Sequence, residues 1–305
     1  MSIPVYKWQP TTKEIAAKAG LDPAEVIRFD HNTSPTTFDW VDDEAATIAP
    51  TLNEYPGADY LPLRQAIAGY TDTHSDQVVA GAGADELILL SAGAFIPNGG
   101  SAVSAPPTYA LYRVATAQRE ADLIEFARSD DDWELDVDRM ADAASRADLV
   151  WLCVPNNPTG QRDQDHGIRS IIESSRGVVV LDAAYAEFTG DRWSRWLDEY
   201  SNLIVLGTMS KAFALAGARV GYSLSSPELA SQLHARRPPG SISTLSAALA
   251  ERALGHPEWA KANVAAVAHQ REALANELQS LGLEPCPTQT NFVLAKVGAG
   301  ARALV

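Results

Sequence analysis

Residues 203–222, LIVLGTMSKAFALAGARVGY, contain an apolar run typical of a buried strand, and Lys211 follows it closely. The strand would hold this lysine at the rim of a sheet, where partial loss of water disfavours the ammonium form and leaves an amine that can attack an aldehyde. Thr208, Ser210 and Arg219 lie nearby in sequence, and hydroxyls with a guanidinium suit a phosphate ester. The stretch therefore predicts a site for an aldehyde that carries a phosphate.

Two further apolar runs end in polar side chains that suit an aromatic cofactor. Residues 150–160, VWLCVPNNPTG, turn at their prolines and present Asn157, whose amide can donate to a phenolic oxygen. Residues 178–188, VVVLDAAYAEF, place Asp182 at a strand end, where a carboxylate can pair with a protonated pyridine nitrogen, and Tyr185 three residues later could bond the ring's oxygen. With the reactive lysine, these groups predict a site for pyridoxal 5'-phosphate.

A fourth segment, GAGADELILL at residues 81–90, places small residues directly before a helical run. The first backbone N–H groups of that helix would form an anion site for the phosphate. Gly81 and Gly83 match the first two glycines of a dinucleotide-binding fingerprint, but Glu86 stands where the third small residue should be. A nicotinamide cofactor is therefore disfavoured.

Apolar strands alternate with helical patterns from residue 77 to residue 225. Seven strands separated by helices predict an α/β fold with a mostly parallel sheet. From Pro227 the pattern turns helical and includes a long run at residues 257–281. The strands are expected at residues 77–80, 102–105, 121–126, 149–154, 178–181, 203–206 and 219–223.

This pattern divides the chain into three parts. Residues 1–35 are expected to form an N-terminal arm and part of a small domain, with a capping box from Thr11 to Glu14 opening a short helix. Residues 36–255 are expected to form the large cofactor-binding domain. Residues 256–305 would then supply a bridging helix and an incomplete small α+β domain.

The composition excludes several functional classes. The chain has 305 residues, of which 46% are hydrophobic, so it can bury a sizeable core. Its 39 acidic and 24 basic side chains give a formal net charge of −15, which argues against a nucleic-acid surface. No apolar run is long enough for a membrane span, the first residues do not form a signal peptide, and the histidines lack metal-ligand spacing. We expect a cytoplasmic protein without a metal.

Taken in order, these motifs resemble the fold-type I pyridoxal-phosphate enzymes, and within them the histidinol-phosphate aminotransferase family. The resemblance covers nearly the whole chain and includes NEYPGADYLPLRQAIAGY (53–70), PPTYALY (106–112) and RRPPGSISTLSAALA (236–250). It implies a three-layer αβα large domain. It also implies transamination of an amino acid or a phosphorylated amino alcohol, with 2-oxoglutarate and glutamate as the second couple.

The resemblance assigns a role to each motif. Lys211 would bond the cofactor aldehyde and later act as general base, and Asp182 would keep the ring nitrogen protonated. Asn157 and Tyr185 would contact the ring oxygen, and Tyr109 would stack on the ring. The phosphate would be held by the backbones of Ala84 and Asp85, by Thr208, Ser210 and Arg219, and by Tyr55 from the other subunit of a homodimer.

The chain departs from the family pattern where substrate would bind. The family's Asn-Glu-Asn-Pro box is replaced by HNTSP at residues 31–35, so only Asn32 and the proline carry over. Asn32 and Tyr55 are the expected substrate contacts. The family also continues for several tens of residues beyond an expected strand at 291–294, with an arginine that binds the substrate carboxylate, whereas residues 298–305 only begin a helical spacing. We therefore expect a truncated reading frame that lacks this arginine.

A second functional class stays open at this point, and a third is disfavoured. A pyridoxal-phosphate decarboxylase resembling the phosphothreonine decarboxylase of cobalamin biosynthesis would use the same cofactor residues. Which bond breaks depends on which bond stands perpendicular to the ring, and the sequence does not show this. A non-catalytic sensor would join a DNA-binding module, for which the residues before position 30 leave no room.

Overall fold

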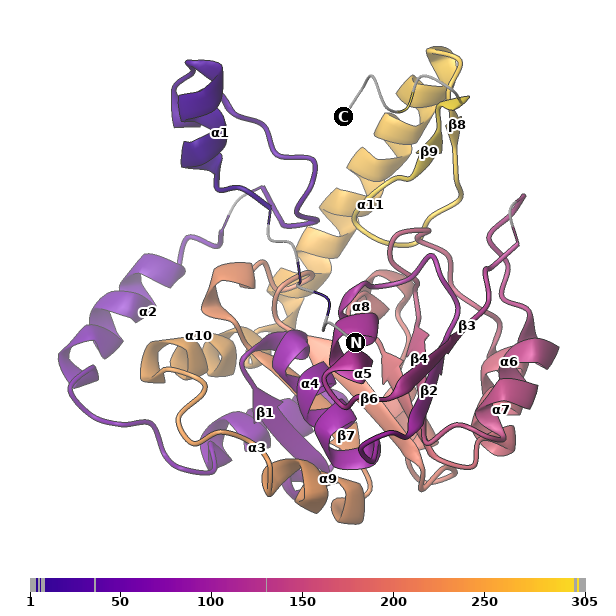
Figure 1. Ribbon diagram of the computed structural model, residues 1–305. Coiled ribbons are helices and arrows are strands. Elements are labelled where there is room, and N and C mark those ends of the chain that lie inside the picture. The colour runs from indigo at the N-terminus through magenta and orange to yellow at the C-terminus, as the bar shows by residue number, and fades with distance from the viewer. Residues whose placement is uncertain are drawn as a thin grey trace.

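One seven-stranded sheet, in the order β1-β7-β6-β5-β4-β2-β3, forms the centre of the computed structural model (Figure 1). The structure describes residues 4, 6, 9–35, 37–129, 131–298 and 301. β7 runs antiparallel to β1 and β6, and the other pairings in this sheet are parallel, which confirms the predicted mostly parallel sheet. The strands are β1 (Val78–Gly81), β2 (Ser101–Ser104), β3 (Asp122–Glu125), β4 (Leu149–Cys153), β5 (Val178–Asp182), β6 (Leu203–Thr208) and β7 (Gly221–Ser225).

Helices cover both faces of the sheet, because alternate side chains of each strand point to opposite faces and both sets are apolar. Trp151 and Ile204 lie in one buried cluster, and their neighbours Val150 and Val205 lie in the other. The first cluster contains residues of α4 (Gly83–Phe95), α5 (Leu111–Ala117) and α9 (Pro227–His234). The second contains residues of α3 (Leu61–Thr71), α6 (Val137–Ala144), α7 (Asp165–Ser174) and α10 (Thr244–Leu254). The three-layer αβα architecture is confirmed.

The N-terminal helix begins where the sequence predicts it. In α1 (Thr12–Ala19), the hydroxyl of Thr11 accepts from the Glu14 N–H at 3.2 Å, and the Glu14 carboxylate accepts from the Thr11 N–H at 2.6 Å. Gly20 ends the helix in the left-handed conformation, with a φ of 70°. The remaining short elements are α2 (Val41–Ile48), α8 (Ala186–Thr189), η1 (Pro23–Glu25), η2 (Ala49–Thr51), η3 (Ser75–Gln77), η4 (Trp193–Trp196) and η5 (Ala216–Ala218).

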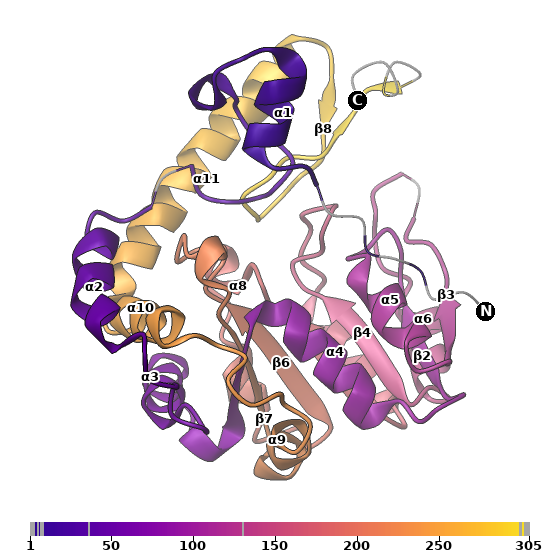
Figure 2. The same ribbon diagram turned by 60° about the vertical axis from the view of Figure 1, so that its left-hand side comes forward.

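A long helix, α11 (Pro257–Ser280), leads away from the sheet to a hairpin of β8 (Glu284–Pro285) and β9 (Ala295–Lys296) (Figure 2). The strand expected at residues 291–294 is wrong: in the described residues β8 pairs with β9, which begins at Ala295. The hydroxyl of Thr290 accepts from the Phe292 N–H at 3.4 Å, so a side chain takes the place of a strand partner there. Most of the helical start expected at 298–305 lies outside the described residues. Within the described ranges, no helix is both long and apolar enough to cross a membrane.

The N-terminus of α4 lies directly against β7 because Gly221 has no side chain. A Cβ atom at Gly221 would lie 2.5 Å from the backbone nitrogen of Ala84. Gly83, the first residue of α4, has a φ of 82°, and a Cβ atom there would lie 2.7 Å from Nη2 of Arg219. Bare backbone at these two positions therefore lets the helix N-terminus, the strand and the guanidinium approach one another.

We expect Gly221→Ala to lower the free energy of unfolding by about 1 to 3 kcal/mol, because the added methyl group must displace the backbone of α4. Gly69→Ala is the matched control, since Gly69 is exposed on α3 and a Cβ atom there would meet no other atom within 4 Å. The control should raise stability by about 0.4 to 1 kcal/mol. Denaturant unfolding of both variants measures the difference, and an unchanged midpoint for Gly221→Ala would contradict the close packing.

Candidate active site

The polar residues predicted from the sequence lie where neighbouring parallel strands end. β5 and β6 pair in parallel, with Asp182 opposite Leu206, so the end of β5 and the loop that follows β6 emerge at one edge of the sheet. This loop carries Lys211. β4 lies on the other side of β5 and leads into the turn with Asn157. Three segments far apart in sequence therefore deliver their polar side chains to one edge.

Lys211 is largely buried, and its amine makes one hydrogen bond to the part of the chain that the structure describes. Nζ donates to the backbone carbonyl of Asn32 at 3.1 Å and lies 5.7 Å from the centre of the Tyr185 ring. Burial lowers the pKa of Lys211 to about 8, although the nearby carboxylates of Asp85 and Asp182 oppose the shift. The amine is therefore uncharged in a larger fraction of molecules at neutral pH than an exposed lysine is, as attack on an aldehyde requires.

Asp182 is buried at the end of β5, with 4% of its surface exposed. Its carboxylate accepts from the Tyr112 hydroxyl at 2.8 Å and from the Ala184 N–H at 3.2 Å. Burial raises the pKa of Asp182 to about 6, and the Tyr112 hydrogen bond opposes that rise. Sequence reasoning missed Tyr112. The available signal was the spacing of the two tyrosines. Tyr112 lies three residues after Tyr109, and α5 begins between them, so both side chains can lie on the same side of the helix start.

The residues predicted to hold a phosphate lie around the N-terminus of α4. The Asp85 carboxylate accepts from Nη2 of Arg219 at 2.8 Å and from the Tyr109 hydroxyl at 2.9 Å. The sequence-based expectation used only the backbone of Asp85, so its side chain adds a contact that ties two other candidate residues to the helix. Thr208 and Ser210 are both buried, and the Thr208 hydroxyl donates to the Ser210 hydroxyl at 3.0 Å.

The pairing of β6 with β7 places these hydroxyls next to the N-terminus of α4. Thr208 pairs with Gly221 in the β6–β7 ladder, and Gly221 contacts the backbone of Ala84 at the start of α4. The first-turn N–H groups of the helix, two hydroxyls and a guanidinium therefore form one group of donors. Such a group suits an anion, since each member contributes positive charge or a hydrogen-bond donor.

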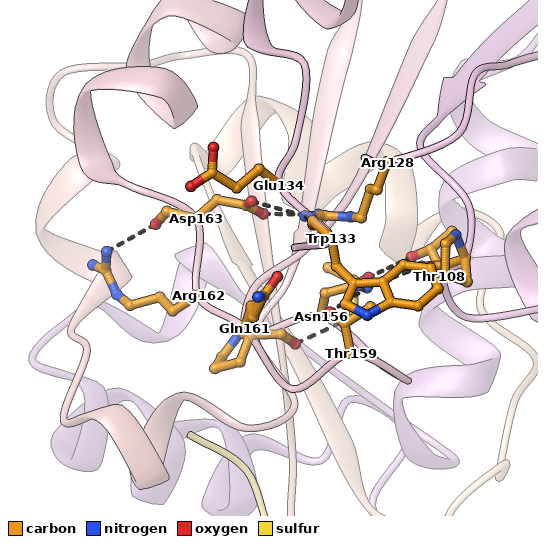
Figure 3. A network of polar contacts seen from close by, with 12 residues as sticks. Thr108, Arg128, Trp133, Glu134, Asn156, Thr159, Gln161, Arg162 and Asp163 are labelled. Atoms are coloured by element: carbon orange, nitrogen blue, oxygen red, sulfur yellow. Dashed lines mark hydrogen bonds and ion pairs between the residues drawn. The ribbon is translucent and has the colours of Figure 1, made fainter. Parts of the chain in front are cut away.

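Asn156, which sequence reasoning missed, holds the turn that carries Asn157 (Figure 3). Its side-chain Oδ1 accepts from the Thr108 hydroxyl at 2.9 Å, and its Nδ2 donates to the Pro107 carbonyl at 2.9 Å. The loop after β4 is thereby fixed to the loop that carries Tyr109. Among the described residues, none forms a hydrogen bond with the Asn157 side chain, so its amide is available to a ligand.

A buried ion pair supports the same loop (Figure 3). Two nitrogens of Arg128 donate to the Asp163 carboxylate at 2.8 Å each, and the two side chains are 3% and 10% exposed. The Arg128 N–H also donates to the Pro106 carbonyl at 2.8 Å. Arg162 donates to the Asp163 carbonyl at 2.9 Å, which extends the network to the segment after the turn.

The two expected substrate contacts lie in different surroundings. Asn32 lies beside the reactive amine: its Nδ2 donates to the Tyr185 hydroxyl at 3.5 Å, and its carbonyl also accepts from Nδ2 of Asn291 at 2.8 Å. Asn291 is a further residue that sequence reasoning missed. Tyr55 is 97% exposed, between η2 and α3, and within the described part of the chain it makes no hydrogen bond or ring contact.

The gathered groups fit the parts of pyridoxal phosphate. A largely buried amine of lowered pKa suits the aldehyde, and a buried carboxylate at the end of the neighbouring strand suits the pyridine nitrogen. The phosphate suits the donors at the start of α4, where glycine at position 83 leaves room for the Arg219 guanidinium. The donor set therefore matches an aldehyde, a basic ring nitrogen and a phosphate at three separate places.

Comparison with known proteins gives the family that the sequence motifs resemble. The profile of the family described as aminotransferase class I and II matches residues 24–305. A histidinol-phosphate aminotransferase of Methanopyrus kandleri is 34% identical over 315 residues, which cover 97% of this chain and 80% of that protein. One from Caldanaerobacter subterraneus is 36% identical over 248 residues, which cover 80% of this chain and 70% of that protein.

Solved structures agree on the fold. The histidinol-phosphate aminotransferase of Sinorhizobium meliloti in complex with pyridoxal-5'-phosphate superposes with a TM-score of 0.89 at 25% identity, over 97% of this chain and 82% of that one. The L-threonine-O-3-phosphate decarboxylase of Porphyromonas gingivalis reaches 0.78 at 23% identity, over 90% and 84%, a likeness that shows the fold alone. The chain belongs to the class I and II aminotransferases, and it is a pyridoxal-phosphate-dependent aminotransferase of fold type I.

Proposed function

We propose that this aminotransferase acts on histidinol phosphate or a similar phosphorylated amino alcohol, with 2-oxoglutarate and glutamate as the second couple. The observation that carries the catalytic part is the placement of a buried amine and a buried carboxylate at adjacent strand ends. The substrate part rests on relatives named histidinol-phosphate aminotransferase at 34% and 36% identity over most of the chain. A phosphothreonine decarboxylase is the weaker candidate, since a likeness of fold alone supports it.

Each side chain at the strand ends has a proposed task. Lys211 would hold the cofactor's aldehyde carbon and, once released, would take the α-proton of the substrate on Nζ. Asp182 would hold the proton of the ring nitrogen, and Asn157 and Tyr185 would donate to the ring oxygen. Tyr109 would stack on the ring. Bound pyridoxal phosphate supplies an electron sink for the carbanion that proton removal leaves.

Release of one ion pair would open the phosphate site. The proposed donors are the N–H groups of Ala84 and Asp85, the hydroxyls of Thr208 and Ser210, and the Arg219 guanidinium. In the structure, Arg219 pairs with the Asp85 carboxylate. An incoming phosphate dianion would compete for this guanidinium, because a bidentate contact to phosphate is stronger than a half-exposed ion pair.

A homodimer and three chain parts complete the proposal. Tyr55 and Asn32 would contact substrate, with Tyr55 coming from the second subunit; its 97% exposure supports this, because a partner would bury the ring.

The division into an arm (1–35), a large domain (36–255) and a C-terminal part (256–305) is proposed on the sequence pattern. Cytoplasmic location is proposed because the two cysteines, Cys153 and Cys286, are free thiols.

Single-turnover spectroscopy tests the proposed reaction. The cofactor-loaded chain is mixed with histidinol phosphate or, separately, with phosphothreonine, without a 2-oxo acid. We expect histidinol phosphate to convert the lysine-bound cofactor band to that of pyridoxamine phosphate, because the amino group stays on the cofactor. Carbon dioxide release from phosphothreonine, with no change on histidinol phosphate, would instead select the decarboxylase.

Chemical trapping tests the role of Lys211. Borohydride reduction of the loaded chain should fix the cofactor on Lys211, and Lys211→Ala should bind the cofactor without a covalent bond. Lys18→Ala is the control, because Lys18 is exposed on α1 and should leave the labelling unchanged. Peptide mapping reads the outcome, and a label on another lysine would refute the assignment.

The pH dependence of stability tests the burial of Asp182. Its pKa of about 6 in the fold exceeds the roughly 3.9 of an unfolded aspartate, so unfolding at intermediate pH releases a proton. The cofactor-free chain should therefore lose stability as the pH rises from about 4 to about 6, by up to about 3 kcal/mol. Asp182→Asn removes this penalty.

Asp182→Asn should thus unfold like the parent at pH 4 and resist denaturant better at pH 8. With cofactor bound the order should reverse, because a neutral amide cannot balance the charge of a protonated ring nitrogen. Denaturant titrations at both pH values measure this. An equal effect of the substitution at pH 4 and pH 8 would be inconsistent with a buried, titrating carboxylate.

A further inference from the structure

The Asn32 carbonyl receives two hydrogen bonds from distant parts of the chain. Nζ of Lys211 donates at 3.1 Å, and Nδ2 of Asn291 donates at 2.8 Å. A backbone carbonyl can only accept, so the amide nitrogen of Asn291, and not its oxygen, must face it. The reactive amine and Asn291 are therefore joined through a single acceptor atom.

This acceptor belongs to a residue in an irregular backbone conformation. Asn32 has a φ of 49°, in the left-handed region that asparagine tolerates better than most residues other than glycine. Asn32 lies in the N-terminal arm, outside any helix or strand. Its carbonyl is therefore oriented by contacts rather than by a regular backbone ladder, and the bond from Asn291 is the shorter of the two that it accepts.

The segment that carries Asn291 is itself firmly held. The Gln289 N–H donates to the Gly160 carbonyl at 2.8 Å, in the loop after β4. Nη1 of Arg271 donates to the Thr290 carbonyl at 2.8 Å, and the Phe292 ring packs edge-on against Tyr185, with ring centres 5.4 Å apart. Contacts of the residues before and after Asn291 therefore hold it in place beside the site.

The Asn291 side-chain amide makes one hydrogen bond in the described part of the chain. Its Oδ1 is buried and accepts no hydrogen bond there, whereas its Nδ2 donates to the Asn32 carbonyl. A buried polar atom without a partner costs free energy, so the side chain is poorly optimised for stability alone. The single bond that it makes leads to the acceptor of Lys211.

We propose that Asn291 is a positioning residue for Lys211: by donating to the Asn32 carbonyl, it fixes the acceptor that holds the free amine at the strand ends. This inference rests on the proposed role of Lys211 and not on the identity of the substrate. An acceptor held in place favours the ammonium form, so loosening it should lower the pKa of Lys211. The other charged or titratable groups that face the amine are Asp85, Asp182, Tyr185 and Arg219, and Asn291 substitutions leave them in place.

The test is the pH midpoint of Lys211 in the full-length, cofactor-free chain. Lysines are methylated reductively with ¹³C-formaldehyde, and the Lys211 signal, assigned by its loss in Lys211→Ala, is titrated by NMR. We expect Asn291→Leu, which keeps the number and branching of the side-chain heavy atoms but removes the donor, to lower the midpoint by about 0.5 to 1 pH unit. Gln289→Ala is the matched control from the same segment, because its exposed side chain makes no hydrogen bond in the described residues, and its midpoint should equal the parent's.

Two results would overturn the proposal. One is a midpoint in Asn291→Leu within about 0.2 unit of the parent, and the other is a rise. Asn291→Ala serves as a second variant if the leucine disturbs folding, and the same shift is expected from it. If the proposed role of Lys211 is itself wrong, borohydride labels another lysine in the parent chain. If only this inference is wrong, labelling stays on Lys211 while the midpoint does not move.

Discussion

The parallel pairing of β5 with β6 is the constraint on which the site depends. In this register Asp182 lies opposite Leu206, so the carboxylate and the loop with Lys211 leave the sheet at the same edge. A slip of one residue would turn Asp182 to the other face of the sheet, away from the Tyr112 hydroxyl that it accepts from. The register of these strands therefore determines the geometry of the candidate site as well as the fold.

Burial at this edge of the sheet disfavours the charged forms of Lys211 and Asp182. It lowers the pKa of Lys211 to about 8 and raises the pKa of Asp182 to about 6, so each group is less readily charged than it would be in water. Neither shift stabilises the cofactor-free chain. The lowered pKa of Lys211 suits a ligand that needs a neutral amine, and a cationic ring nitrogen would offset the cost of a buried Asp182 carboxylate; functional sites commonly differ from a packed core in this way.

The sequence alone predicted those features that local patterns determine. Apolar runs located all seven strands to within a few residues, and the polar side chains that follow them identified Lys211, Asp182 and Asn157 as neighbours. The strand expected at residues 291–294 was wrong, because the Phe292 N–H donates to the Thr290 hydroxyl there and the ladder of β9 begins only at Ala295. The individual tasks of the site residues remain predictions.

Long-range partners could not be predicted in this way. The Tyr112 bond to Asp182, the Asn156 bonds to the Tyr109 loop and the Asn291 bond to Asn32 each join segments that only the tertiary fold brings together. A side-chain amide or hydroxyl carries no signal in sequence about which distant acceptor it will reach. The supporting contacts of the site therefore had to come from the structure.

The most direct test of this account is a crystal structure of the chain grown with pyridoxal phosphate. We predict continuous electron density between Nζ of Lys211 and the cofactor, with the ring nitrogen within hydrogen-bonding distance of Asp182 and the phosphate at the N-terminus of α4. A cofactor bonded to another lysine, or a phosphate bound away from α4, would contradict it.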